Sequence, residues 1–92
     1  MDDLEINLQR GDRAKLLLED ELLNEMLAKI EEDCFREIRA SSLLEGEVRE
    51  KAYLILKTVD ILKSKLRTVM DTGKMAEVQL VRRRGRPPKV QE

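Results

Sequence analysis

The feature that most constrains this fold is an apolar seam between residues 48 and 69. Its members recur at alternating spacings of four and three residues, which is the pattern of an unbroken heptad repeat on an α-helix. Charged residues occupy the positions between them, so the opposite face of the helix is solvated. The seam itself must be buried against another helix. Its members are Val48, Ala52, Ile55, Val59, Leu62, Leu66 and Val69.

Further apolar residues widen this face. Leu54 and Ile61 form a stripe beside the seam, and Tyr53 and Leu56 extend it. A face this broad exceeds what contact with one other helix covers, and it is typical of a helix in a bundle. The sequence therefore predicts an all-α fold.

A second helical pattern occupies residues 13–40, which contain no proline or glycine. One stripe of this pattern is apolar, so the helix needs a partner. Because the connection to the seam helix is short, we expect an antiparallel two-helix hairpin over residues 13–74. The apolar stripe consists of Leu16, Leu23, Leu27, Ile30, Cys34 and Ile38.

Local signals predict the ends of the seam helix. Ser42 and Glu45 have the spacing of a capping box, which predicts a helix start near Leu43. Gly46 instead favours a later start, near Glu47. Gly73 is predicted to cap the C-terminal end of the helix.

Residues 1–12 are predicted to form an N-terminal arm. Apolar and polar residues alternate in its first part, a pattern that fits either a short strand or a mobile arm. Gly11 is expected to end the arm, and Asp12 is expected to cap the helix that follows. The alternating apolar residues are Leu4, Ile6 and Leu8.

Residues 75–92 are predicted to form a basic tail. The apolar spacing in residues 75–81 fits either a third short helix or a strand. Residues 82–92 carry a net charge of +4, whereas residues 1–81 carry −5. An acidic body is therefore followed by a basic segment.

Two helices side by side leave one flank of each apolar stripe uncovered. We therefore expect the hairpin to self-associate, either as a four-helix-bundle dimer or as a ring. A chain of 92 residues buries only a modest core by itself, which also favours a homo-oligomer.

Several kinds of chemistry find no support in the sequence. There is no histidine and no glycine-rich phosphate loop, so the acidic runs at residues 19–21 and 31–33 are interpreted as solvated helix surface. We expect no enzymatic activity, no cofactor and no metal site. Cys34 is the only cysteine, so an internal disulfide is excluded, and its position in the apolar stripe predicts a buried structural thiol.

The sequence contains no apolar run of the roughly 18 residues that a membrane span needs. We therefore expect no membrane partner. The expected location is intracellular, in the cytoplasm or within a phage particle or packaging complex.

The one specific motif lies in the basic tail, where residues 82–89 read Arg-Arg-Arg-Gly-Arg-Pro-Pro-Lys. The ordered Arg-Gly-Arg-Pro core resembles the AT-hook of minor-groove DNA-binding proteins. The resemblance implies an extended peptide in the minor groove of A/T-rich double-stranded DNA, with Arg84 and Arg86 along the groove floor. The predicted DNA-binding residues are Arg82, Arg83, Arg84, Gly85, Arg86, Pro87, Pro88 and Lys89.

The physical chemistry of these residues agrees with a groove-binding peptide. Gly85 lacks a Cβ, so its backbone can approach the groove floor, while Pro87 and Pro88 favour an extended chain. A/T-rich DNA has a narrow minor groove whose negative potential attracts arginine, whereas the guanine amino group obstructs the floor. The simpler alternative is a basic tail that contacts phosphates without sequence preference.

A helical hairpin with an appended DNA-contacting segment is similar to the oligomerisation core of phage small-terminase-like DNA-packaging proteins. We therefore predict a non-enzymatic, oligomeric DNA-binding protein, with itself, A/T-rich DNA and a larger packaging or virion protein as partners. The alternative is a virion or assembly protein whose helices pack on a larger partner and whose basic tail neutralises nucleic acid.

Overall fold

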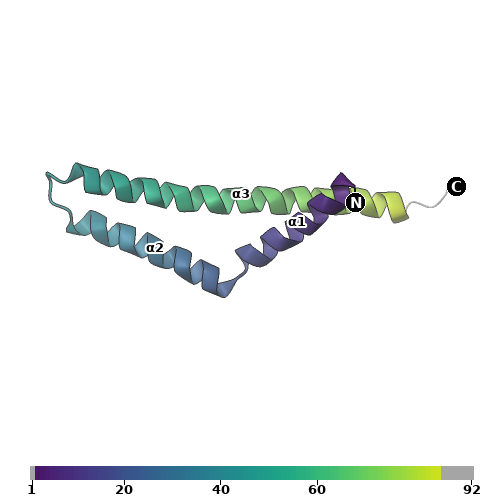
Figure 1. Cartoon of the computed structure of the whole chain (residues 1–92), viewed down its shortest axis with the longest axis horizontal. Coiled ribbons are helices and arrows are strands. Elements are labelled where there is room, and N and C mark those ends of the chain that lie inside the picture. Colours follow the sequence, from purple (N-terminus) through teal and green to yellow (C-terminus); the bar gives the residue numbers. More distant parts are fainter. Residues whose placement is uncertain (1, 86–92) are drawn as a thin grey trace. The chain divides into compact units, whose positions relative to one another are not determined.

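The computed structural model describes residues 2–85, and these residues form three α-helices without any strand. Helix α1 spans Asp3–Leu18, α2 spans Glu21–Ala40 and α3 spans Gly46–Gly85. Figure 1 shows them in chain order, from the purple α1 through the blue α2 to the long α3. The predicted all-α class is therefore confirmed.

The helices divide into two compact units. The first unit combines Met1–Leu17 with Leu66–Glu92, so it contains α1, except its last residue, and the C-terminal part of α3. The second unit is Leu18–Lys65 and contains α2 and the N-terminal part of α3. The packing of each unit follows from its own residues.

Residues 3–12 are helical, so the predicted N-terminal strand or mobile arm is wrong. The helix is started by a capping box: Asp2 Oδ1 accepts a hydrogen bond from the Glu5 backbone N–H at 3.0 Å, and Glu5 Oε1 accepts one from the Asp2 N–H at 3.4 Å. Leu4 and Leu8 lie one helical turn apart and are both half-buried. These apolar side chains are therefore covered on one face of a helix and do not alternate between the two faces of a strand.

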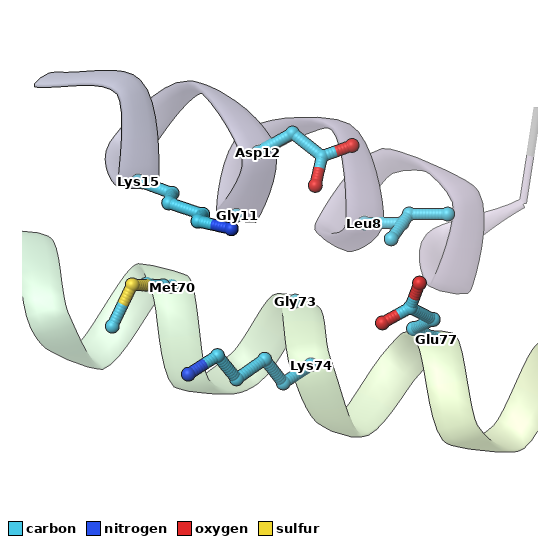
Figure 2. A pocket seen from close by; sticks show the side chains of 8 residues that line it. All are labelled: Leu8, Gly11, Asp12, Lys15, Met70, Gly73, Lys74 and Glu77. Carbon is cyan, nitrogen blue, oxygen red and sulfur yellow. The ribbon is translucent and has the colours of Figure 1, made fainter. Parts of the chain in front are cut away.

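Gly11 and Gly73 lie inside α1 and α3, although they were predicted to end the arm and to cap a helix. Both predictions are wrong, and neither glycine has a positive φ. A Cβ on Gly11 would lie 2.7 Å from Cα of Gly73, and a Cβ on Gly73 would lie 2.7 Å from Cα of Gly11. These glycines are needed because the two helix backbones meet there. Figure 2 shows them on the facing sides of the two ribbons.

Small residues extend this contact along both helices. Each glycine is followed three residues later by a buried alanine, Ala14 in α1 and Ala76 in α3. Leu80, one turn beyond Ala76, is also buried. The first unit is therefore held by close backbone packing, in which many short-range dispersion contacts replace the interdigitation of large side chains.

The two helices of this unit are antiparallel. Asp2 pairs with Arg83, and Gly11 faces Gly73, so residue numbers rise along α1 as they fall along α3. The start of α1 consequently lies beside the C-terminal end of α3.

In the second unit, the predicted uninterrupted helix over residues 13–40 is wrong, because the chain turns at Asp20. Asp20 has an extended backbone with φ −71° and ψ 121°, and its Oδ2 accepts a hydrogen bond from the Leu23 N–H at 2.9 Å. It is therefore the N-cap of α2. The Asn24 side-chain amide donates to the carbonyl oxygens of Leu18 at 2.8 Å and Asp20 at 2.9 Å, so it satisfies two backbone acceptors beside the helix break.

The core of the second unit consists of heptad positions. Leu27 and Cys34 are buried on α2, and Ala52 and Val59 are buried on α3, each pair seven residues apart. The prediction of a buried thiol is confirmed. Burial raises the pKa of Cys34, and neighbouring carboxylates, first that of Glu37, raise it further.

The connection between α2 and α3 is organised by Arg49. Its guanidinium donates to Ser41 Oγ at 2.9 Å and to the Ser42 carbonyl at 2.6 Å. The Ser42 N–H donates to Glu45 Oε1 at 2.7 Å, as a capping box requires. Helix α3 nevertheless begins at Gly46, between the two predicted starts.

Residues 75–81 continue α3, so the strand alternative is wrong, and this segment is not a separate third helix. Helix α3 goes on through residues 82–85, where an extended tail was expected, and that expectation is also wrong. Ala76 and Leu80 explain the continuation, because both are buried against α1 within the first unit. The remainder of the predicted tail lies outside the described residues.

The Gly11–Gly73 contact predicts that Gly73→Ala destabilises the protein. The added methyl group meets backbone, which cannot move aside as a side chain does, so the helices must separate. We expect the free energy of unfolding to fall by about 1–2 kcal/mol, since overpacking outweighs the gain in helix propensity. Urea unfolding followed by circular dichroism at fixed protein concentration measures this change.

Gly46→Ala is the matched control, because its Cβ would lie 3.8 Å from Arg49 Nη2, an ordinary contact. It should leave stability unchanged or slightly raised. Equal stability of the Gly73 and Gly46 variants would show that the backbones do not meet at residue 73.

Candidate nucleic-acid interface

Three consecutive arginines, Arg82, Arg83 and Arg84, form the last turn of α3 and are exposed. Cations are favoured at this end of a helix, where the unpaired carbonyls give a partial negative charge. Gly85 ends the helix. The other four predicted DNA-binding residues lie outside the described residues: Arg86, Pro87, Pro88 and Lys89.

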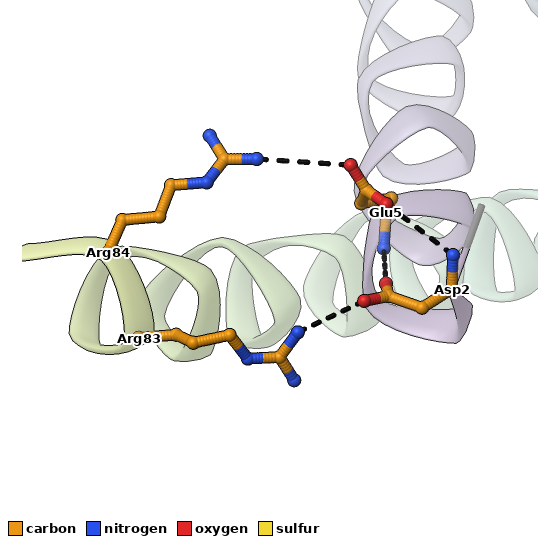
Figure 3. Close-up of polar contacts among 4 residues, drawn as sticks. All are labelled: Asp2, Glu5, Arg83 and Arg84. Atoms are coloured by element: carbon orange, nitrogen blue, oxygen red, sulfur yellow. Dashed lines mark hydrogen bonds and ion pairs between the residues drawn. The ribbon is translucent and has the colours of Figure 1, made fainter.

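Two of these arginines contact the first turn of α1, as Figure 3 shows. Arg83 Nη1 donates to Asp2 Oδ2 at 3.0 Å, and Arg84 Nη2 lies 3.8 Å from Glu5 Oε2. Among the described residues, Arg82 makes no ion pair. The Arg84 side chain keeps 72% of its surface exposed, so its pairing with Glu5 is a solvated contact of low strength.

The same two carboxylates also start α1. Asp2 uses Oδ1 to accept from the Glu5 N–H and Oδ2 to accept from Arg83, while Glu5 uses Oε1 for the Asp2 N–H and Oε2 for Arg84. The hydrogen bond from the Glu5 backbone, followed by the one from Arg83, lowers the pKa of Asp2. This carboxylate is therefore ionised at neutral pH.

The opposition of charges follows from helix geometry. Acidic residues are favoured at the positive start of a helix, and basic residues are favoured at its negative end. Because α1 is antiparallel to the C-terminal part of α3, these two ends lie together. The arginines are thus exposed to solvent at the end of a helix, with intramolecular anions at their side.

The predicted oligomer seam divides into two rows. Ala52 and Val59 are buried inside the second unit, whereas Ile55 and Leu62 keep 46% and 43% of their surface exposed. The chain therefore covers one row by its own folding and leaves the other accessible. The remaining seam members, which are half-buried, are Val48, Leu66 and Val69.

A groove of about 160 Å³ lies beside the glycine contact in the first unit (Figure 2). Its rim carries charges of both signs, with Asp12 and Lys15 on α1 and Lys74 and Glu77 on α3. Such a rim favours neither an anion nor a cation. Over residues 2–85 there is no group of three or more side chains arranged to hold a metal ion, and no helix there is long and apolar enough to cross a membrane.

The acidic half of this site was not recognised from the sequence. The sequence-based predictions gave Asp2 and Glu5 no role, although their spacing of three residues is that of a capping box. That spacing was the available signal for a helix start at residue 3.

Comparison of the chain with protein-family models, with curated proteins and with solved structures gave no match.

Proposed function

We propose that the protein is a non-enzymatic homo-oligomer that binds A/T-rich double-stranded DNA through the basic segment 82–89. The observation that carries this proposal is the ordered Arg-Gly-Arg-Pro core at residues 84–87, which directly continues the exposed arginines at the end of α3. A role as a small-terminase-like subunit in phage-type DNA packaging is part of the proposal, because an oligomeric helical body with a DNA-contacting segment resembles those proteins.

DNA binding changes the last turn of α3 in this proposal. Arg84 and Gly85 are helical, whereas a groove-bound hook is extended, so this turn must unwind on DNA. Unwinding costs little at a helix end, where the last carbonyls lack intrahelical partners. Arg84 and Arg86 then enter the minor groove, while Arg82, Arg83 and Lys89 contact phosphates.

A single hook binds weakly, because a short peptide loses conformational freedom and makes few contacts. The acidic body, with a net charge of −5 over residues 1–81, is also repelled by the phosphates. Several hooks in one oligomer overcome this, because the second and later contacts are intramolecular. Self-association is therefore an integral part of the proposed function.

The second unit offers a surface for self-association. Ile55 and Leu62 each lie three residues after a buried residue of α3, and Ile30 lies three residues after the buried Leu27 of α2. When two helices pack antiparallel, a residue three positions after a buried contact residue faces the same flank of the pair on either helix. With Met26, these residues form one surface, called here the apolar face: Met26, Ile30, Ile55 and Leu62, each 40–46% exposed.

A second copy of the chain is the partner that we propose for the apolar face. Helix α2 carries six acidic and three basic residues, whereas residues 46–65 of α3 carry three acidic and five basic residues. A two-fold dimer that sets α2 of each copy against α3 of the other brings opposite charges together and encloses both apolar faces. The product is a four-helix bundle.

Leu62→Lys tests this arrangement. It places a charge at the centre of the apolar face, so we expect a monomer in light scattering, with helicity retained because Leu62 is not one of the buried core residues. Ile61→Lys is the matched control: Ile61 is 53% exposed but points to a different side of α3, so the oligomer should persist.

Unchanged mass in the Leu62 variant would contradict the proposed face. A wild-type protein that is itself monomeric would contradict self-assembly and favour the alternative function, in which the helices pack on a larger virion or assembly protein.

Arg86→Lys tests the hook. The substitution keeps the charge but replaces a flat, weakly hydrated guanidinium with a compact ammonium, so the preference for A/T-rich over G/C-rich duplexes should largely disappear. Arg82→Lys, at a proposed phosphate contact, is the control and should retain the preference. Fluorescence anisotropy over a range of salt concentrations measures both affinities.

Contact of Arg82, Arg83 and Lys89 with one phosphate each predicts a log–log salt slope of roughly −2.7 per hook. Equal binding of the wild type to both duplexes, without an effect of Arg86→Lys, would reduce the segment to a nonspecific basic tail.

A further inference from the structure

The first turn of α1 brings an anionic pair to the arginines of the proposed DNA-binding segment. Asp2 Oδ2 accepts from Arg83 Nη1 at 3.0 Å, and Glu5 Oε2 lies 3.8 Å from Arg84 Nη2 (Figure 3). Both side chains are oriented by the capping box, which uses their other carboxylate oxygens. These acids are therefore held in place even when no arginine is bound.

Carboxylate and phosphodiester groups present the same chemistry to a guanidinium. Both are anions with two acceptor oxygens, and both form charge-assisted hydrogen bonds with arginine. An arginine that binds Asp2 or Glu5 cannot direct the same N–H groups at a phosphate. DNA and the start of α1 must therefore compete for Arg83 and Arg84.

We propose that the capping box of α1 is an internal competitor for DNA, which holds Arg83 from the phosphates and Arg84 from the minor groove until a duplex displaces it. This inference rests on the proposed DNA-binding function. It assigns to Asp2 and Glu5 an inhibitory role in addition to their role in starting α1.

The glycine contact keeps the competitor near its target. Gly11 and Gly73 join the two helices backbone to backbone, about two turns from the capping box. The acids are thus tethered beside the arginines at a high effective concentration, and α1 cannot leave without breaking that contact.

Displacement is nevertheless easy for DNA. All four side chains are at least 42% exposed, and solvated ion pairs of this kind are weak. A duplex offers several phosphates at once and releases condensed counterions, whereas an isolated small anion offers a single contact. The device therefore suppresses binding to scattered anions and adjusts the affinity for DNA.

Asp2→Asn is the test variant. Asparagine is a good N-cap, so the start of α1 is preserved, while the negative charge that binds Arg83 is lost. We expect the affinity for an A/T-rich duplex to rise by about two- to fivefold, the range expected for one solvated ion pair. The control is Asp3→Asn, which removes the same charge from the same turn; within the described residues Asp3 makes no ion pair.

A double-mutant cycle isolates the pair. In an Arg83→Gln background there is no guanidinium to release, so Asp2→Asn should raise affinity no more than Asp3→Asn does. A larger effect of Asp2→Asn in the wild-type background than in the Arg83→Gln background supports internal competition.

The outcomes separate the two levels of the proposal. If the wild type binds the duplex and Asp2→Asn equals Asp3→Asn in both backgrounds, internal competition is wrong while DNA binding stands. If neither the wild type nor Asp2→Asn binds duplex DNA, the proposed function is wrong and the inference falls with it.

Discussion

The contact on which the first unit depends is the approach of Gly11 and Gly73. A side chain at either position would need space that the opposite backbone already fills, since its Cβ would lie 2.7 Å from a Cα atom. Close packing makes such a contact specific, because a shift along either helix would bring a larger residue into the gap. The contact therefore fixes the register of α1 on α3. That register in turn sets Asp2 opposite Arg83, which lies 81 positions further along the sequence.

The two units use apolar residues in different ways. The first unit closes on small residues, so it buries little side-chain volume but brings two oppositely charged helix ends together. The second unit closes on one row of the heptad seam and leaves Ile55 and Leu62 accessible. In the proposed function these differences are complementary: the accessible row assembles copies of the chain, and the charged ends govern how each copy engages DNA. Affinity then comes from the number of hooks, since each hook binds weakly and is opposed by the acidic body.

Periodicity predicted the helical class and most of α3, because an apolar repeat is a local property of the sequence. The predictions for Gly11 and Gly73 were wrong, because glycine commonly marks the end of a helix. Only the facing backbone shows that glycine is needed inside these two helices. The helix break at Asp20 had only a weak signal. Asp is a preferred N-cap residue, but Leu18 and Leu22 are four residues apart, so the apolar stripe continues across the break as it would in one helix. The basic half of the candidate site could be read from its motif. Its acidic half could not, because a contact across 81 residues is set by tertiary register and leaves no local pattern.

The glycine contact can be observed directly. In an isotope-labelled sample, a nuclear Overhauser effect between the α protons of Gly11 and Gly73 reports that the two backbones meet, and an isotope-filtered experiment on mixed labelled and unlabelled protein separates contacts within one chain from contacts between chains. We expect a strong intramolecular cross-peak that is absent from the filtered spectrum. A missing cross-peak in a folded, assigned sample would contradict the register that sets Asp2 and Glu5 against the arginines of α3.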